Sequence, residues 1–219
     1  MRTRAWTRTQ ALDDPAVAKG RAAAYAWPDD NGENVMAILF TADLHLGHSN
    51  IIKHTQRPFA DADEMDRALI ANWNAVVAPS DEVWVLGDFC FRSVRDASDY
   101  LSKLHGVKHL VVGNHDSPET RAAKGWKSVQ DYGEVSIDGT KIVLSHYGMR
   151  VWNGSHHGSV HLYGHSHGRL PGFMTPSGGG CLDVGVDSWY YAPVRWADIK
   201  RQLEALPMVQ QEEYEGDDD

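Results

Sequence analysis

Residues 109–116 read H-L-V-V-G-N-H-D, a short apolar run followed without a break by a glycine, an amide, an imidazole and a carboxylate. Gly113 and Asn114 are sufficient for a turn, because both residue types tolerate a positive φ. A turn does not need His115 and Asp116 as well. The stretch therefore predicts a buried strand whose end carries chemically active side chains.

The same arrangement recurs along the chain, where side chains of metal-ligating types follow predicted strands. The predicted strands are residues 38–41, 83–86, 109–112, 135–137, 141–145, 160–163 and 181–184. The polar side chains that follow them are Asp43, His45, Asp88, Asn114, His115, Asp116, His146, His165 and His167. Because ligands of α/β sheets bind beyond the carboxyl ends of the strands, we expect these side chains to converge on one site.

Other stretches have the apolar spacing of amphipathic helices. One lies over residues 65–76, after the capping-type residues Asp61 and Asp63. A second is a stripe made of Val94, Ala97, Leu101 and Leu104, and a third lies over residues 196–206. Strands mixed with helices, and a hairpin turn at Asp138-Gly139, predict an α/β sandwich of two packed sheets with flanking helices.

The two ends of the chain differ in composition from its middle. Residues 1–35 have little apolar periodicity, which predicts an N-terminal extension that is poorly ordered or peripheral. A short helix around residues 22–26, packed on the domain, is the alternative. Residues 36–207 form the predicted domain, and residues 208–219 have the composition of an acidic disordered tail.

Length, charge and cysteine content limit the possible classes of function. A chain of 219 residues is long enough for one well-buried domain. Its net charge of −9 argues against a sequence-independent grip on duplex DNA, although a bound metal would still allow a small anionic substrate. No apolar run has the length of a membrane span, and Cys90 and Cys181 make no disulfide framework. These features predict a cytoplasmic protein.

The series D-x-H at 43–45, G-D at 87–88, G-N-H-D at 113–116, His146 and G-H-x-H at 164–167 resembles the signature of the calcineurin-like metallophosphoesterase superfamily. The resemblance covers residues 38–184, and the text around the motifs is similar to small phage-type and bacterial-type members. It implies a four-layer αββα sandwich of two mixed β-sheets with flanking helices. It also implies a site for two metal ions at the carboxyl ends of the strands.

The resemblance divides the ligands between two ions. It implies that Asp43, His45, Asp88 and His167 hold one ion, and that Asp88, Asn114, His146 and His165 hold the other. Asp88 is then the bridge, and two divalent ions ~3.5–4 Å apart require an anionic group between them. Carboxylate, amide and imidazole ligands without a thiolate suit Mn²⁺, Fe or Zn²⁺, and the pattern does not select among them.

The resemblance also assigns the catalytic roles. It implies a metal-bridging hydroxide as the nucleophile, His115 as the general acid that protonates the leaving oxygen, and Asp116 as the residue that orients His115. His48 and Arg57 are predicted substrate contacts. A helix-cap role for His48 and a surface salt bridge for Arg57 are the alternatives.

Together these features predict a metal-dependent phosphoesterase that acts on a small phosphoester. A phosphodiester, such as a nucleotide, is favoured over a phosphomonoester. Alternatives are a phosphomonoesterase, a phosphoprotein phosphatase, a non-catalytic scaffold and a nucleotide sensor of the same fold. Metal-dependent turnover of a chromogenic ester distinguishes the enzymes from the last two. The sequence predicts no membrane partner and no particular oligomeric state.

Overall fold

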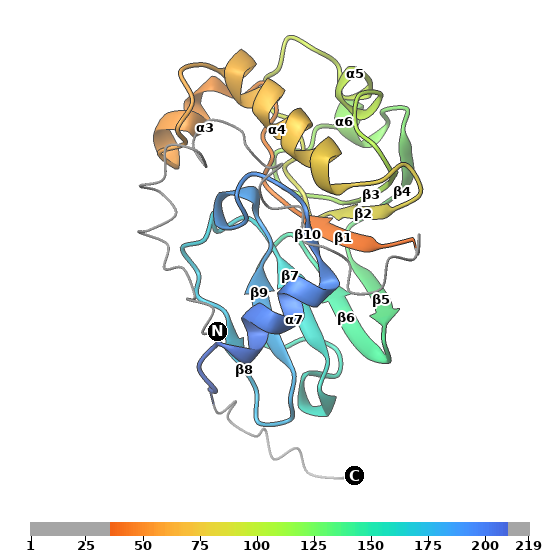
Figure 1. The fold of residues 1–219 in the computed structure, drawn as a ribbon, viewed down its shortest axis with the longest axis vertical. Helices are drawn as coiled ribbons and strands as arrows, with labels where there is room; N and C mark the ends of the chain where they lie inside the picture. The colour runs from red at the N-terminus through yellow and green to blue at the C-terminus, as the bar shows by residue number, and fades with distance from the viewer. Residues whose placement is uncertain (1–35, 210–219) are drawn as a thin grey trace, which may run out of the picture.

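A computed structural model describes residues 36–209 of the chain. The predictions for residues 1–35 and for most of the acidic tail lie outside the described residues. Strands and helices alternate along the described part (Figure 1). The strands are β1 (Ile38–Thr41), β2 (Glu82–Val85), β3 (Val107–Val111), β4 (Trp126–Gln130), β5 (Gly133–Ile137), β6 (Thr140–Leu144), β7 (Val160–Tyr163), β8 (Phe173–Met174), β9 (Gly180–Asp183) and β10 (Val194–Arg195). The α-helices are α3 (Ser49–His54), α4 (Ala62–Val76), α5 (Ala97–Leu101), α6 (Pro118–Arg121) and α7 (Trp196–Glu204), and the 3-10 turns are η2 (Ser155–His157) and η3 (Val186–Ser188).

The strands form two mixed sheets. The first is 5-stranded with the order β10-β1-β2-β3-β4, in which β1 to β4 are parallel and β10 is antiparallel to β1. The second is 5-stranded with the order β5-β6-β7-β9-β8, in which β6, β7 and β9 are parallel. The antiparallel hairpin β5-β6 turns at Asp138-Gly139, as the sequence predicts.

Alternation along the strands divides the core into layers, because successive side chains point to opposite faces of a sheet. In β1, Leu39 packs with the helices α4 and α5, whereas Phe40 packs between the two sheets with side chains such as Leu162. In the second sheet, Val143 points away from the first sheet and packs with Trp152. The two sheets therefore share one apolar interior, and each has an apolar outer face as well.

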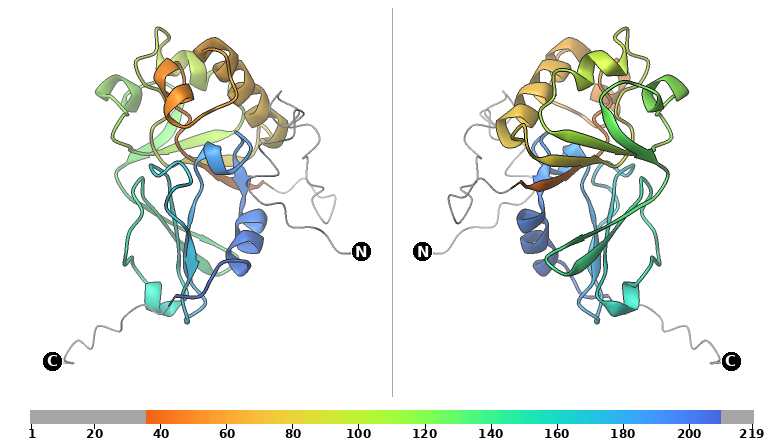
Figure 2. Two further views of the ribbon diagram at one scale, coloured as in Figure 1. Left: turned by 90° about the vertical axis from the view of Figure 1, so that its left-hand side faces the viewer. Right: turned by 90° about the vertical axis from the view of Figure 1, so that its right-hand side faces the viewer.

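Helices cover the outer face of the first sheet, and the two turned views agree on this arrangement (Figure 2). Asp61 caps the N-terminus of helix α4, and its side chain accepts a 2.8 Å hydrogen bond from the main-chain N–H of Glu64. Its buried stripe includes Met65, Leu69 and Trp73, which are the positions that the sequence predicts. Helix α7 lies beside the second sheet and contacts strands of both sheets.

The predicted fold class, two mixed sheets with flanking helices, is confirmed. The predicted helix with the stripe from Val94 to Leu104 is wrong at its start. Helix α5 covers only Ala97–Leu101, and Val94 is fully exposed on the preceding loop. Helix α7 ends at Glu204, two residues before the predicted end at Leu206. Among the helices of residues 36–209, none has the length and apolar character needed to cross a bilayer.

Candidate metal centre

The predicted ligands lie just beyond the carboxyl ends of parallel strands. Those after β1, β2 and β3 meet those after β6 and β7 at one edge of the sandwich. The ligand atoms of Asp43, His45 and His167 lie within 4.8 Å of one another, and so do those of Asp88, His146 and His165. The structure thus brings the predicted residues together in two neighbouring groups, which we call the first and second ligand groups.

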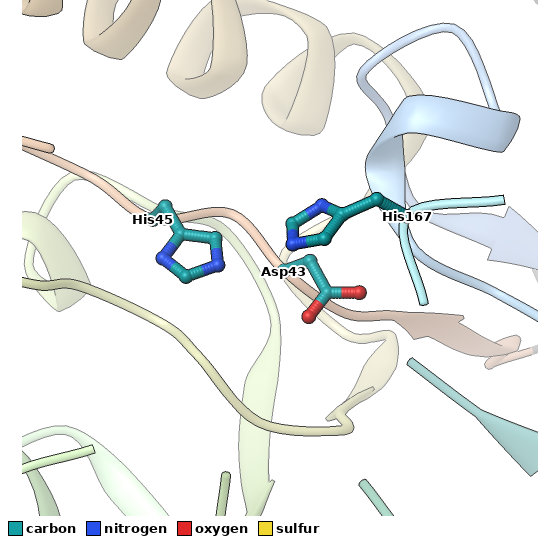
Figure 3. A group of neighbouring side chains, drawn as sticks. All are labelled: Asp43, His45 and His167. Carbon is teal, nitrogen blue, oxygen red and sulfur yellow. The ribbon is translucent and has the colours of Figure 1, made fainter. Parts of the chain in front are cut away.

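The first ligand group is almost sealed from solvent. Figure 3 shows the carboxylate of Asp43 and the imidazoles of His45 and His167 gathered around a common point. Oδ2 of Asp43 and both ring nitrogens of His45 are buried without a hydrogen-bond partner among the described residues. Since unpaired buried polar atoms are costly, a cation at this point would satisfy them.

The electrostatics of the first group also favour a cation. Burial, followed by the neighbouring carboxylates of Asp183 and Asp88, raises the pKa of Asp43 well above its usual value. Burial, followed by the charge of Arg57, lowers the pKa of His45 far below its usual value. A neutral imidazole can ligate a metal, and a divalent ion would compensate the clustered carboxylates. The residues present therefore fit a metal ion.

The second ligand group centres on His146. Its Nδ1 lies 2.8 Å from the carbonyl oxygen of Leu86, which can only accept, so Nδ1 carries the proton. Nε2 then has only a lone pair, and it faces Oδ1 of Asn114 at 3.0 Å. Two acceptors in contact are expected where a cation lies between them. This group also fits a metal ion.

The carboxylate of Asp88, a member of the second group, also faces the first group. Its Oδ2 is 3.4 Å from Nε2 of His45 and 3.5 Å from Nε2 of His146. Its Oδ1 accepts a 2.8 Å hydrogen bond from the main-chain N–H of His115. One oxygen is therefore fixed by the main chain, while the other faces a ligand from each group.

The backbone at the ligands is unusual. A positive φ, which non-glycine residues rarely adopt, occurs at many of the ligand positions. These are Asp43 (57°), His45 (52°), Asp88 (56°), His165 (65°) and His167 (49°). The sequence suggests that Gly113 provides a positive φ for a turn, but the structure requires glycine there for another reason. Its φ is not positive, but a side chain there would overlap Oδ1 of Asp88.

His115 borders the two groups without belonging to either. Its half-buried ring has its centroid 5.3 Å from that of His45 and 4.3 Å from that of Phe91. A cavity of about 350 Å³ opens beside it, with Phe91, Arg92 and Thr120 among its lining residues. The guanidinium of Arg92 lies 5.1 Å from the centre of the Phe91 ring. His115 therefore lies between the two ligand groups and this cavity.

Asp116 does not orient His115, contrary to the sequence-based expectation. Its buried carboxylate accepts main-chain N–H groups from Asp88, Phe89 and Gly113 at 2.8 to 2.9 Å. Within residues 36–209 it makes no hydrogen bond to the His115 ring. Asp116 instead joins the loop after β2 to the loop after β3. A carboxylate at a tight turn commonly accepts main-chain N–H groups, and this signal was available in the sequence.

His48 lies beside the first ligand group. Its ring centroid is 5.4 Å from that of His45 and 6.4 Å from that of His115. It occupies the N-cap position of α3, but its side chain makes no capping hydrogen bond, and its Nδ1 is buried without a partner among the described residues. The capping alternative is therefore wrong, and the ring is near enough to the site to reach a bound molecule.

Arg57 is not placed for the phosphate contact expected from sequence. Its side chain is fully buried, and its guanidinium bonds to Asp187 and to main-chain carbonyl oxygens. Nor is it a surface salt bridge, the alternative reading. Arg57 bonds to the turn that carries Asp43 and His45, and its side chain has no exposed surface.

Sequence reasoning missed Asp183 and Asp187, which also lie at this edge. Asp183 accepts main-chain N–H groups from Gly168 and Gly185, and a hydroxyl from Ser166. Asp187 accepts a 2.7 Å hydrogen bond from Nδ1 of His167. Burial opposes ionisation of Asp187, but this hydrogen bond and the charge of Arg57 together lower its pKa below the usual value. The signal was present, since Asp183 ends β9 and Asp187 follows it by four residues in η3.

Comparison with known proteins agrees with this geometry. Residues 36–175 match the sequence profile of the calcineurin-like phosphoesterase superfamily domain. An uncharacterized protein of Methanocaldococcus jannaschii is 32% identical over 178 residues, covering 78% of this chain and 94% of that protein. The gene 66 protein of Mycobacterium phage D29 is 30% identical over 181 residues, covering 70% of this chain and 89% of the phage protein. A solved structure of a protein of unknown function from Aquifex aeolicus has the same fold, with a TM-score of 0.59 at 22% identity over 77% of this chain and 100% of that one.

Proposed function

The chain belongs to the calcineurin-like phosphoesterase superfamily, and from its site we propose that it is a metal-dependent hydrolase of phosphodiesters that uses two divalent ions. The first ion is held by Asp43, His45, Asp88 and His167. The second is held by Asp88, Asn114, His146 and His165. Mn²⁺, Fe and Zn²⁺ all suit this mixture of carboxylate, amide and imidazole ligands.

The observation that carries the proposal is the position of Oδ2 of Asp88. It faces Nε2 of His45 at 3.4 Å and Nε2 of His146 at 3.5 Å, so one oxygen serves both ligand groups. Buried atoms without partners in the first group, and facing acceptors in the second, support a cation in each. When bound, such ions supply Lewis acidity and a nucleophile at neutral pH.

In this proposal His115 is the general acid. Its main chain is fixed to Asp88, and its ring lies between the ligand groups and the cavity lined by Phe91 and Arg92. A leaving group that enters this cavity places its ester oxygen next to the imidazole. Proton transfer to that oxygen avoids the release of an alkoxide, and such general acid catalysis contributes ~10²–10⁴-fold to the rate.

A small diester is the proposed substrate class, and a nucleotide is an example. The cavity of about 350 Å³ beside His115 has room for a leaving group. The net charge of −9 gives no support for a grip on duplex DNA.

The test compares bis(p-nitrophenyl) phosphate with p-nitrophenyl phosphate as substrates of the metal-stripped protein. Mn²⁺, Zn²⁺, Fe²⁺ or Mg²⁺ is added back, and bound ions per chain are counted. We expect two ions per chain, faster turnover of the diester, and loss of turnover in Asp88→Asn. Asp131→Asn is the matched control, because it makes the same change at an exposed carboxylate between β4 and β5.

Each outcome bears on a different part of the proposal. Faster turnover of the monoester would overturn the substrate class and favour a phosphomonoesterase. Two bound ions without turnover of either ester would overturn the enzymatic function and favour a scaffold or a nucleotide sensor. A chain that binds no ion would overturn the metal centre itself.

A further inference from the structure

Arg57 connects the parts of the first ligand group that come from distant parts of the sequence. Its Nη2 donates to the carbonyl oxygen of Asp43 at 2.7 Å, and its Nη1 donates to that of Leu44 at 2.9 Å. These carbonyls belong to the turn after β1 that carries the ligands Asp43 and His45. The Arg57 side chain has an exposed fraction of 0%, so no solvent competes for these hydrogen bonds.

The same guanidinium holds Asp187 through two parallel hydrogen bonds. Nε donates to Oδ1 at 2.9 Å and Nη2 donates to Oδ2 at 2.8 Å. This two-point contact fixes the plane of the carboxylate, which a single-point contact from a lysine could not do. Asp187 is 130 residues from Arg57 in the sequence. Because Arg57 also holds the two carbonyl oxygens of the turn after β1, its side chain joins that turn to η3.

Asp187 in turn orients His167. Its Oδ2 lies 2.7 Å from Nδ1 of His167, and both oxygens of this carboxylate already accept from Arg57, so the carboxylate also accepts from His167. Nδ1 therefore carries a proton, which leaves Nε2 as the ring nitrogen that can ligate an ion. A hydrogen bond to the distal nitrogen of a ligating histidine fixes both its tautomer and its ring plane.

The second ligand group does not share this support. Within residues 36–209, His146 bonds to the carbonyl oxygen of Leu86 and faces Asn114, and no hydrogen bond joins the second group directly to Arg57 or Asp187. A change at Arg57 or Asp187 therefore acts directly on the first group. It reaches the second group only indirectly, through Asp88 and through the 3.0 Å hydrogen bond from the main-chain N–H of His165 to Oδ1 of Asp43.

We propose that Arg57 and Asp187 are positioning residues that align Asp43, His45 and His167 as one ligand group. Their loss selectively weakens the binding of the ion held by that group. The inference rests on the proposed two-ion centre. It goes beyond that proposal because it gives two residues that contact neither ion a role in the affinity of one ion site and not of the other.

The test uses two conservative variants and one control. Arg57→Lys keeps the charge but removes the two-point contact, and Asp187→Asn keeps the shape but removes the charge. Lys108→Met is the matched control. Lys108 is also a buried cation that donates to main-chain carbonyls, those of Leu101 and Leu104, but it contacts no ligand. Circular dichroism first establishes that each variant is folded.

Calorimetric titration with Mn²⁺ or Zn²⁺ gives the affinity of each ion. We expect wild type and Lys108→Met to bind two ions. In Arg57→Lys and Asp187→Asn, we expect one ion at wild-type affinity and the other bound ~10–100-fold more weakly. Folded variants that bind both ions like wild type would overturn the positioning role alone, whereas a wild type that binds no ion would overturn the two-ion centre as well.

A second measurement does not depend on the folding of any variant at Arg57 or Asp187. In the chelator-treated wild type, the ¹⁵N signals of the histidine rings report which nitrogen carries the proton. The signals of His167 are those missing from His167→Gln. We expect a proton on Nδ1. A ring without a proton on Nδ1 would overturn the inference.

Discussion

The main-chain N–H of His115 donates a 2.8 Å hydrogen bond to Oδ1 of Asp88, the carboxylate that lies between the two ligand groups. The proposed proton donor and the proposed bridging ligand therefore have a fixed relative position. This link is made by the backbone, so it does not depend on the imidazole. The two roles can be separated by mutation.

His115→Ala should keep both ions and lose most activity on esters with poor leaving groups. The alanine retains the main-chain N–H, so Asp88 keeps its partner. Without the imidazole, kcat for an alkyl leaving group should fall ~10²–10⁴-fold, while a nitrophenyl ester, whose leaving group needs little protonation, should lose much less. Steady-state kinetics with a series of leaving groups measures this. Equal losses across the series, or loss of an ion, would show that His115 has another role.

Asp116→Asn should destabilise the protein rather than change the protonation behaviour of His115. The asparagine side chain keeps one acceptor oxygen, but the carboxylate accepts three main-chain N–H groups, from Asp88, Phe89 and Gly113. At least one buried N–H loses its partner, which costs ~1–3 kcal/mol in the free energy of unfolding. Urea denaturation measures the cost, with Asp131→Asn as the control. A shifted pH profile of kcat at unchanged stability would restore the orienting role expected from sequence.

Leu162→Ala should strongly destabilise the sandwich. Leu162 has an exposed fraction of 0% and packs between the two sheets. Removal of its side chain leaves a cavity, and the free energy of unfolding should fall by ~2–5 kcal/mol. Val94→Ala is the informative comparison, because Val94 is fully exposed on the loop before α5 and should change stability by less than ~0.5 kcal/mol. A large effect of Val94→Ala would favour the helical stripe expected from sequence.

His161 should make the protein less stable in mildly acidic solution. The ring is fully buried, and burial lowers its pKa although the carbonyl oxygens of residues 143 and 147 face its two nitrogens. As the pH falls through about 6.5, His161 becomes protonated in the unfolded chain but stays neutral in the folded chain. The free energy of unfolding therefore decreases. In His161→Gln, the side chain at this position has no titrating group. Its stability deficit relative to wild type should therefore shrink as the pH falls, by at most about 1.4 kcal/mol per pH unit. Urea titrations between about pH 7.5 and 5 test this, and a constant deficit would contradict it.

The fold was largely predictable because its strands are short apolar runs that end in polar residues. Strands β1 and β7 have the predicted bounds. Strand β4 was missed because it is an edge strand, and its residues Trp126–Gln130 alternate between half-buried and exposed. The helix predicted from Val94 was too long because apolar spacing alone does not mark a helix start. Asp96, a capping-type residue, immediately precedes α5.

The site was less predictable than the fold. The sequence indicates which residues end strands, and the structure brings those residues together. It does not indicate how a charged side chain is used once it is buried. Arg57 and Asp116 both have the residue types expected of catalytic groups, yet both bond to the backbone. Those contacts depend on loops that meet only in the folded chain, so no local pattern reveals them.

The positive φ at the ligand positions sets the stability of the chain against the presence of a ligand side chain. A non-glycine residue with positive φ costs roughly 1–2 kcal/mol, and Asp43, His45, Asp88, His165 and His167 all adopt it. A glycine at any of these positions would relieve that cost while deleting a ligand. The five side chains are therefore held at a cost in stability that a glycine would avoid, so the folding of these turns and the presence of the ligands make opposite demands on the same residues.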